Sequence, residues 1–217
     1  MCIDNEDLKM KKLLIYGASY PDIFNLIDDI NMECPTWDVV GVLDDTVTVE
    51  EFMGYPIIGN KNVLNDVHYS ECFVVNNVFS RPSSREHVAC RIMNSGRQIP
   101  SLIHPSVTAK RSHIGQGVIV MDGVRLGART VLGDHVTVRY NAIINHDNVL
   151  EPFVFVGPGA TLCGHVVIGR SAYIGAGSVI REHLHVGADA FVGMGSVVIK
   201  NVHATTTVFG NPAVVKE

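Results

Sequence analysis

Aliphatic residues recur at every sixth position through the second half of the chain. A period of six fits neither a single helix, which repeats about every 3.6 residues, nor a single strand, which repeats about every two. The unbroken series has fifteen members: Ile114, Val120, Leu126, Leu132, Val138, Ile144, Leu150, Val156, Leu162, Ile168, Ile174, Ile180, Val186, Val192 and Val198. If about a third of residues were aliphatic at random, this series would arise on the order of once in several million trials. The pattern predicts a parallel β-helix of hexapeptide repeats, with one aliphatic side chain of each repeat in a central stack.

A second inward position is predicted four residues after each aliphatic one. Small residues often stand there, namely Thr130, Ala142, Ala160, Ala172, Ser178, Ala190 and Ser196. Three strands per turn give a coil of about eighteen residues, so the series builds about five coils. Because the backbone of an end coil lacks a neighbour, such a structure needs caps, and we expect the tail 208–217 to cap the C-terminal end. The all-β domain is predicted over residues 101–217.

Residues 11–100 alternate between apolar strands and amphipathic helices. We expect strands at 11–17, 37–43 and 72–75, a loop at 55–59, a helix from Pro21–Asp22 and a second helix from about Ser83 to Gly96. Such alternation favours a small parallel sheet, so this part is predicted to be a Rossmann-like, nucleotide-fold α/β domain. Residues 1–10 are predicted to form an N-terminal extension.

Charge, hydropathy and cysteine content exclude several classes of protein. The formal net charge is −5 and the pI is about 6.0, so no basic surface indicates a nucleic-acid partner. No apolar run approaches the ~20 residues of a membrane-spanning helix, so no membrane partner is expected. The five cysteines are odd in number and include no CxxC pair, which favours neither a disulfide framework nor a thiolate zinc site. A reduced, cytoplasmic location is expected.

Four features together resemble a known family. They are the hexapeptide series, the turn Gly17-Ala18-Ser19, the segment Asn145-His146-Asp147 and the terminal Gly210-Asn211-Pro212-Ala213. Over residues 11–217 the chain resembles the sialic-acid O-acetyltransferase (NeuD-type) sugar acyltransferases, which include N-acetyltransferases of nucleotide-linked 4-amino sugars. The resemblance implies a left-handed coil, a homotrimer, acetyl-CoA as co-substrate, no metal, and a sugar or nucleotide-sugar acceptor.

His146 and Asp147 are the candidate catalytic residues. A neutral imidazole accepts a proton near neutral pH, and His146 stands near a predicted corner of the coil, where its side chain can point outward. The resemblance implies that His146 is the general base and that Asp147 orients it and stabilises the imidazolium. The alternative from the residues alone is that the segment 145–148 is a polar corner turn.

The resemblance also implies a groove for coenzyme A. The residues that match its border are Phe155, Gly164, Ala176, Gly177, Gly195, Gly210 and Pro212. Glycine allows a ligand to approach the backbone closely, although turns of this repeat require small residues in any case. Phe155 replaces a histidine that the family often carries, and we expect it to pack on the acetyl or pantetheine group.

Candidate acceptor-binding residues follow the predicted strands of the first domain, where ligands bind in parallel sheets. They are Gly17, Ala18, Ser19, Asp44, Asp45, Asn76 and Asn77. The family's Gly-Ala-Gly/Ser-Gly-His-Gly turn is replaced here by Gly17-Ala18-Ser19-Tyr20-Pro21-Asp22. Asp22 at a helix start disfavours a phosphate there, because it takes the place of the anion. Nucleotide binding at this turn is left open.

A metal site is not expected. His165 and His183 are eighteen residues apart, so they are predicted to stack one coil above the other, and no His-x4-His pair typical of γ-class carbonic anhydrases occurs. The leading hypothesis is an acetyl-CoA-dependent acetyltransferase in which a sugar amine or hydroxyl attacks the thioester directly. The alternatives are a sialic-acid-type O-acetyltransferase, a γ-carbonic-anhydrase-like metal enzyme and a non-catalytic hexapeptide-repeat binding protein.

Overall fold

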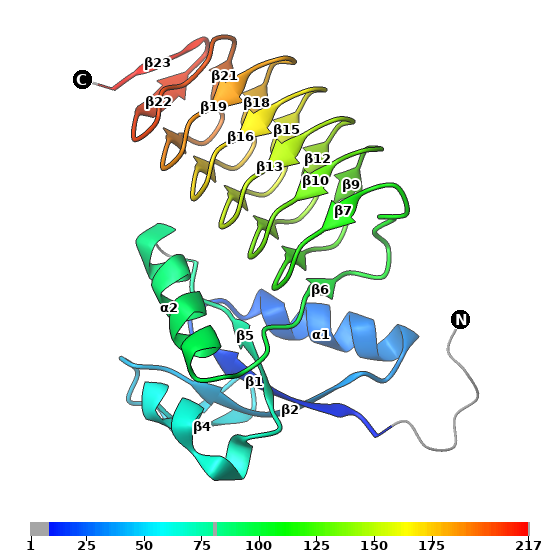
Figure 1. Ribbon diagram of the computed structural model, residues 1–217, viewed down its shortest axis with the longest axis vertical. Coiled ribbons are helices and arrows are strands. Elements are labelled where there is room, and N and C mark those ends of the chain that lie inside the picture. Colours follow the sequence, from blue (N-terminus) through cyan, green and yellow to red (C-terminus); the bar gives the residue numbers. More distant parts are fainter. Residues whose placement is uncertain (1–8, 80–81, 217) are drawn as a thin grey trace. The chain divides into compact units, whose positions relative to one another are not determined.

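The computed structural model describes residues 9–79 and 82–216 and divides between Pro100 and Ser101 into two units (Figure 1). The predicted extension 1–10 lies outside the described residues except for Lys9 and Met10. No helix of the described part is long and apolar enough to cross a membrane. Of the cysteines, Cys72, Cys90 and Cys163 are free thiols.

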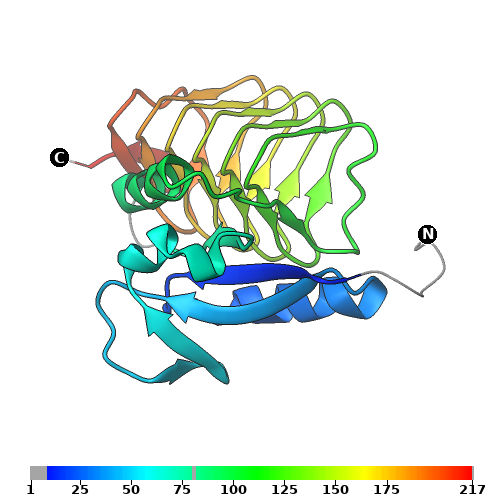
Figure 2. The ribbon, with the colours of Figure 1, turned by 60° about the horizontal axis from the view of Figure 1, so that its bottom comes forward.

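The first unit is built on a five-stranded sheet with the order β3-β4-β2-β1-β5. Its strands are β1 (Lys11–Tyr16), β2 (Trp37–Leu43), β3 (Glu51–Phe52), β4 (Tyr55–Gly59) and β5 (Phe73–Asn76). The helical segments are α1 (Asp22–Glu33), η1 (Lys61–Asn65), η2 (Val67–Tyr69) and α2 (Pro82–Asn94). Strands β1, β2, β4 and β5 run parallel, and β1 and β2 lie side by side in Figure 2. The predicted parallel α/β domain is confirmed.

Residues 55–59 correct one expectation, because they form β4 instead of a loop. Pro56 argued against a strand, since proline cannot donate a ladder hydrogen bond. Strand β4 pairs with β2 on one side and only with the two-residue β3 on the other, so it lies next to the sheet edge, where a missing donor is tolerated.

The second unit is a coil of very short parallel strands that form three walls. The first wall contains β7 (His113–Ile114), β10 (Val131–Leu132), β13 (Val149–Leu150), β16 (Val167–Ile168) and β19 (His185–Val186). The second wall contains β6 (Leu102–Ile103), β8 (Ile119–Val120), β11 (Thr137–Val138), β14 (Phe155–Val156), β17 (Tyr173–Ile174), β20 (Phe191–Val192), β22 (Thr207–Gly210) and β23 (Ala213–Val215). The third wall contains β9 (Arg125–Leu126), β12 (Ile143–Ile144), β15 (Thr161–Leu162), β18 (Val179–Ile180) and β21 (Val197–Val198). The predicted β-helix of hexapeptide repeats is confirmed.

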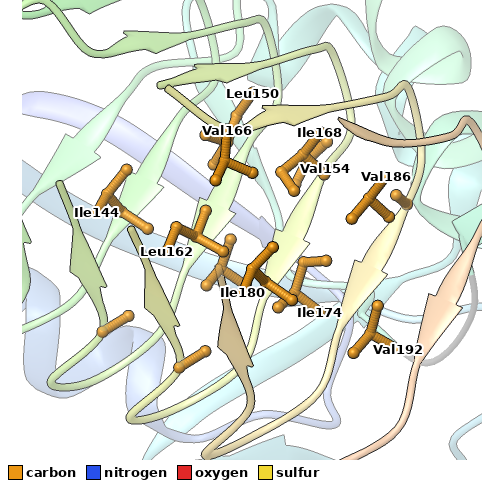
Figure 3. Packing of buried hydrophobic residues seen from close by; sticks show 14 of the residues in the cluster. Ile144, Leu150, Val154, Leu162, Val166, Ile168, Ile174, Ile180, Val186 and Val192 are labelled. Atoms are coloured by element: carbon orange, nitrogen blue, oxygen red, sulfur yellow. The ribbon is translucent and has the colours of Figure 1, made fainter. Parts of the chain in front are cut away.

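Each of the fifteen aliphatic residues is the second residue of a strand, and Figure 3 shows Ile144, Leu162 and Ile174 among those that point into the coil. All are buried except Ile114 and Leu126, which are partly buried and pack against the same cluster. The small residues at the second inward position, such as Ala142 and Ser178, are also buried. Larger residues, such as Val154, Val166 and Leu184, are buried at the same position in other repeats, so this position belongs to the core of the coil whatever the size of its side chain.

The chain crosses each corner of the coil through a residue with positive φ. Along one corner these residues are Arg129, Asp147, His165 and His183, with φ between 59° and 61°. We call this the histidine corner; it joins the third wall to the first. Along the corner that joins the second wall to the third, Gly159, Gly177 and Gly195 take the same conformation, and we call it the glycine corner. Equivalent residues of successive coils therefore form columns with a spacing of about eighteen residues.

Replacing Leu162 by Ala tests the central stack. Leu162 has no exposed surface, so Leu162→Ala should leave a cavity and lower the free energy of unfolding by about 2–5 kcal/mol. Ile143→Ala is the matched control, because Ile143 lies on the neighbouring strand with 40% of its surface exposed. Chemical denaturation measures both, and an equal loss in the two variants would contradict the packing described.

Candidate active site

His146 and Asp147 lie together on the histidine corner, between β12 and β13. Nδ1 of His146 is 2.7 Å from Oδ2 of Asp147, and 57% of the His146 side chain is exposed. The backbone holds both residues between neighbouring coils: the Asp147 N–H donates to the Ala128 carbonyl, and the His146 carbonyl accepts from the His165 N–H. The structure therefore presents the imidazole outward, with a carboxylate at one ring nitrogen.

A buried asparagine gives the corner its shape. Asn148 occupies a second inward position and is fully buried. Its side-chain amide donates to the Asn145 carbonyl at 3.0 Å, and its carbonyl oxygen accepts from the Val166 N–H at 2.6 Å. Because a buried amide is stable only when it is hydrogen-bonded, these contacts fix the turn that carries His146. The segment 145–148 is a polar corner turn, and this turn carries the His146–Asp147 pair.

Asp147 is held by a second partner that the sequence analysis missed. Nε and Nη2 of Arg129 donate to its two carboxylate oxygens at 2.6 and 2.7 Å. The hydrogen bonds from Arg129 and, second, from His146 hold the pKa of Asp147 well below its usual range. The carboxylate is therefore ionised at neutral pH and can only accept hydrogen bonds. The eighteen-residue spacing of Arg129 and Asp147 is the sequence signal that could have revealed the pair.

Gly164 lies directly against the His146 ring. A Cβ atom at Gly164 would be 2.8 Å from Cε1 and 3.0 Å from Nε2 of His146. Such distances are shorter than van der Waals contact, so any larger residue would displace the imidazole. Gly164, which the resemblance placed at the coenzyme groove, therefore lies beside the candidate base.

Two further histidines continue the column above Asp147. The rings of His165 and His183 stack with centroids 4.7 Å apart and an interplanar angle of 8°. This agrees with the stacking expected from their spacing. His165 also packs edge-on against His146, and its Nε2 is 3.7 Å from Oδ2 of Asp147.

Ligand atoms of His146, Asp147 and His165 lie within 4.8 Å of one another, close enough in distance alone for a metal ion. The chemistry of this set does not fit the γ-carbonic-anhydrase alternative, which needs three converging imidazoles. Here only two imidazoles converge, and the third group is a carboxylate whose two oxygens already accept from the Arg129 guanidinium. The arrangement fits an acid–base pair better than a metal centre.

The other residues expected at the coenzyme groove lie elsewhere on the coil. Ala176, Gly177 and Gly195 stand on the glycine corner, where the Gly195 N–H donates to the Ala176 carbonyl at 2.8 Å. Gly210 is the last residue of β22, and Pro212 lies in the turn that leads to β23, at the end of the second wall. Within one chain, therefore, only Gly164 of this set adjoins His146.

Phe155 heads a stack of aromatic rings on the second wall. Its ring lies 4.8 Å from that of Tyr173, which in turn lies 4.7 Å from that of Phe191. The three residues are the first residues of β14, β17 and β20, whose side chains alternate with the inward aliphatic ones. Phe155 thus packs within an aromatic ladder, and the eighteen-residue spacing accounts for it.

In the first unit, Asp44 organises the turn after β1. Its Oδ2 accepts from the Ala18 N–H at 2.8 Å, and its Oδ1 accepts from Thr46 and Val47. Burial acts in the opposite direction, but these hydrogen bonds lower the pKa of Asp44. Because both oxygens are engaged by the protein, Asp44 shapes the turn at Gly17-Ala18.

The two asparagines after β5 also bind the protein's own backbone. Asn77 is fully buried, and its amide donates to the Gly17 and Tyr20 carbonyls at 2.9 Å. The Asn76 amide donates to the Arg85 carbonyl at 2.9 Å. These contacts join the loop after β1 to β5 and α2, so the two asparagines have a structural role in this part of the domain. Asn77 offers no exposed surface to a ligand.

A pocket of about 530 Å³ opens at the carboxyl ends of β1 and β2. Its lining includes Tyr16, Ser19, Asp44, Asp45 and Arg91. Nη1 of Arg91 donates to Oδ2 of Asp45 at 2.7 Å and to the Tyr16 hydroxyl at 2.5 Å, and that hydroxyl donates to Oδ2 of Asp45 at 2.9 Å. Burial, above all, raises the pKa of Tyr16 to about 12, so this phenol stays protonated.

Tyr16 and Arg91 were missed by the sequence analysis. Tyr16 is the last residue of an apolar strand, and Arg91 lies in the last turn of α2, where a solvated arginine is common. Nothing local shows that the two meet Asp45, because the three residues come from different elements. Of the predicted acceptor residues, Ser19, Asp44 and Asp45 line the pocket.

Comparison with known proteins places the chain in a family. The family profile described as "Bacterial transferase hexapeptide (six repeats)" matches residues 149–182. GDP-perosamine N-acetyltransferase of Escherichia coli O157:H7 is 31% identical over 158 residues, which cover 72% of this chain and 70% of the relative. The chain belongs to the hexapeptide-repeat sugar acyltransferases.

Solved structures of other sugar acyltransferases extend the similarity to nearly the whole chain. The acetyltransferase domain of PglB from Neisseria gonorrhoeae, solved in complex with acetyl coenzyme A, is 31% identical, covers 96% of this chain and 100% of that chain, and has a TM-score of 0.86. Perosamine N-acetyltransferase from Caulobacter crescentus, solved with CoA and GDP-perosamine, is 24% identical, covers 98% of this chain and 100% of that chain, and shares the fold with a TM-score of 0.87. The sugar acyltransferase described here therefore has both domains of its structural neighbours, and the prediction of an acyltransferase is confirmed.

Proposed function

We propose that this sugar acyltransferase moves the acetyl group of acetyl-CoA to an amine of a nucleotide-linked sugar, with His146 as general base. The observation that carries the proposal is the exposed His146 imidazole with Asp147 at 2.7 Å from its Nδ1. Acetyl-CoA is the donor. Amine acceptors are favoured over hydroxyl acceptors because the 31%-identical relative is named an N-acetyltransferase of GDP-perosamine. O-acetylation of a sialic-acid-type sugar is the alternative.

The hydrogen bond to Asp147 sets the tautomer of His146. Because the ionised carboxylate can only accept, Nδ1 of the neutral imidazole carries the hydrogen, and Nε2 keeps its lone pair. Nε2 then takes a proton from the acceptor amine as its nitrogen attacks the thioester carbonyl carbon. The tetrahedral intermediate collapses with cleavage of the C–S bond, and the departing sulfur receives the proton from Nε2. The products are the N-acetylated sugar and CoA.

The pocket of the first unit is the proposed site for the nucleotide part of the acceptor. Asp45 and Arg91 offer an acceptor and a donor of hydrogen bonds at the carboxyl ends of the strands, where nucleotides bind in parallel sheets. Hydrogen bonds from the Lys61 N–H, Tyr16 and Arg91 outweigh burial and lower the pKa of Asp45, which remains an anion. An anionic carboxylate suits the N–H groups of a nucleobase better than a phosphate.

A homotrimer is part of the proposal, because the candidate coenzyme residues of one chain lie on different corners. His146 and Gly164 stand on the histidine corner, and Gly177 stands on the glycine corner. A neighbouring copy can bring its glycine corner to the histidine corner of the first, which completes a groove for coenzyme A. Light scattering of the purified enzyme measures the assembly, and a monomer that is fully active would contradict this part of the proposal. The cytoplasm is the proposed location, because acetyl-CoA and nucleotide-linked sugars are available there.

The function is tested by a mass-spectrometric screen. Purified enzyme is incubated with acetyl-CoA and, one at a time, with nucleotide-linked amino sugars, the corresponding hydroxyl sugars and free sialic acids. Gain of one acetyl group by an amino sugar, at a rate that exceeds the reaction without enzyme, supports the proposal. Acetylation of a hydroxyl sugar or sialic acid alone would favour the O-acetyltransferase, and no acceptor together with no binding of acetyl-CoA would contradict the proposal.

Replacing Arg91 by Ala tests the acceptor pocket. Loss of a charged hydrogen-bond donor of this kind costs about 1.5–3 kcal/mol, so Arg91→Ala should raise the KM for the nucleotide sugar about 10- to 100-fold. The KM for acetyl-CoA is the internal control and should not change. Equal changes in the two KM values, or none, would remove Arg91 from the acceptor site.

A further inference from the structure

The Arg129–Asp147 ion pair on the histidine corner has a more specific geometry than an ordinary surface ion pair. Its geometry is bidentate, with one guanidinium nitrogen on each carboxylate oxygen. Oδ2 is shared between Nη2 of Arg129 and Nδ1 of His146, at 2.7 Å from each. The three side chains therefore form one chain of hydrogen bonds that runs from Arg129 through Asp147 to the candidate base.

We propose that Arg129 is a positioning residue for His146, acting through Asp147: it fixes the plane of the carboxylate and offsets its charge, so that the imidazole stays oriented and unprotonated until substrate supplies the proton. The inference rests on the proposed function of His146 as general base and adds a residue eighteen positions earlier in the chain, on the preceding coil.

The two parallel hydrogen bonds from Arg129 to Asp147, here called the fork, fix the orientation of the carboxylate. A carboxylate that accepts only from His146 can rotate about its terminal torsion, because that torsion is broad. Two parallel N–H···O contacts from a planar guanidinium remove this rotation. With Arg129 in place, Oδ2 faces Nδ1 of His146 and keeps the lone pair of Nε2 pointing outward.

A neighbouring histidine, His165, competes with His146 for the Asp147 carboxylate. Nε2 of His165 is 3.7 Å from the same Oδ2, so His165 is a competing partner for Asp147. Without the guanidinium, a modest rotation of the carboxylate would bring it to His165 and loosen its contact with His146. Arg129 thus selects one of two imidazoles as the partner of Asp147.

Four groups determine the electrostatic environment of the His146 imidazole. Asp147 is adjacent, Arg129 binds Asp147, His165 packs edge-on, and His183 stacks on His165. An unpaired carboxylate next to an imidazole stabilises the protonated, inactive form of a base. The positive charge of Arg129 offsets that effect, and so it keeps the base in its working form toward lower pH.

Stability is not the role of this pair. Arg129 is 72% exposed, and surface ion pairs contribute little to folding. Removal of the side chain should therefore leave the melting temperature within about 2 °C of the parent, which allows changes in activity to be read directly.

Three variants separate the two parts of the proposal. Arg129→Ala removes the fork and the charge: kcat should fall about tenfold, and the acid limb of the pH–rate profile should move up by about half to one pH unit. Arg129→Lys keeps the charge but loses the bidentate geometry, so kcat should fall and the acid limb should stay in place. Asp147→Asn removes the negative charge, so the acid limb should move down.

Two controls make the outcome specific. Arg125→Ala removes an exposed arginine of β9, the strand that precedes Arg129 in the chain, and should change neither kcat nor the pH profile. In a His146→Ala background, Arg129→Ala should add no further loss of rate, because its effect runs through the imidazole.

The result that overturns the proposal is Arg129→Ala with the kcat and acid limb of the parent enzyme, or with a loss of activity that follows a lowered melting temperature. Failure of the proposed function is a different result: it would appear as full activity of His146→Ala in the parent background. If activity depends on His146 but not on Arg129, only this inference is rejected and the proposed function stands.

Discussion

His146→Ala should lower kcat by about 10²- to 10⁴-fold and leave the Kd for acetyl-CoA unchanged. The magnitude is that of a lost general base. The reason for the unchanged Kd is that the imidazole acts on the acceptor amine, which is absent from the binary complex with the donor. Steady-state rates measure the first quantity and calorimetric titration with acetyl-CoA measures the second.

The control for this variant is His113→Ala. His113 is an exposed histidine of the first wall, four coils before His185, and has no assigned part in the reaction. It should keep the parent rate. Because 57% of the His146 side chain is exposed, His146→Ala should also keep the parent melting temperature. Full activity of the variant would reject His146 as the base.

Gly164→Ala should lower kcat about 10- to 100-fold with almost no loss of stability. The added methyl group would lie 2.8 Å from Cε1 of His146, so the ring must move, and a displacement on the order of 1 Å can cost about 100-fold in rate. Gly164 is not among the residues with positive φ, so alanine fits its backbone. The His146 ring, which must move to make room for the methyl group, belongs to an exposed side chain. The effect expected on the free energy of unfolding is therefore small.

A double-mutant cycle tests this interpretation. If Gly164→Ala acts through the imidazole, it should add no further loss of rate in the His146→Ala background. If instead it blocks coenzyme A, as the resemblance implied for this position, the Kd for acetyl-CoA should rise in both backgrounds. Calorimetry and steady-state kinetics on the two single variants and the double variant distinguish the two outcomes.

The β-helix could be predicted from the sequence because its signal is local and repeated. Each hexapeptide places one aliphatic residue inward, as Leu162 does, and each coil contacts only its neighbours, so the period alone specifies the strands and the stack. The pair His146–Asp147 was predicted through the resemblance to the sugar acyltransferases, and the repeat placed both residues on one corner because adjacent residues share a phase. The alternation in residues 11–100 likewise predicted the parallel sheet, but it missed β4 because Pro56 obscured the strand pattern.

Only the tertiary structure decided what surrounds the candidate base. Arg129 reaches Asp147, and Gly164 faces the His146 ring, because successive coils stack equivalent positions side by side. The same holds for Tyr16, Asp45 and Arg91, which come from a strand, a loop and a helix. The sequence by itself determined the repeat and the placement of His146 and Asp147 on one corner, since both depend on short-range order. The structure decided their partners, because those contacts join residues whose proximity depends on how whole elements pack.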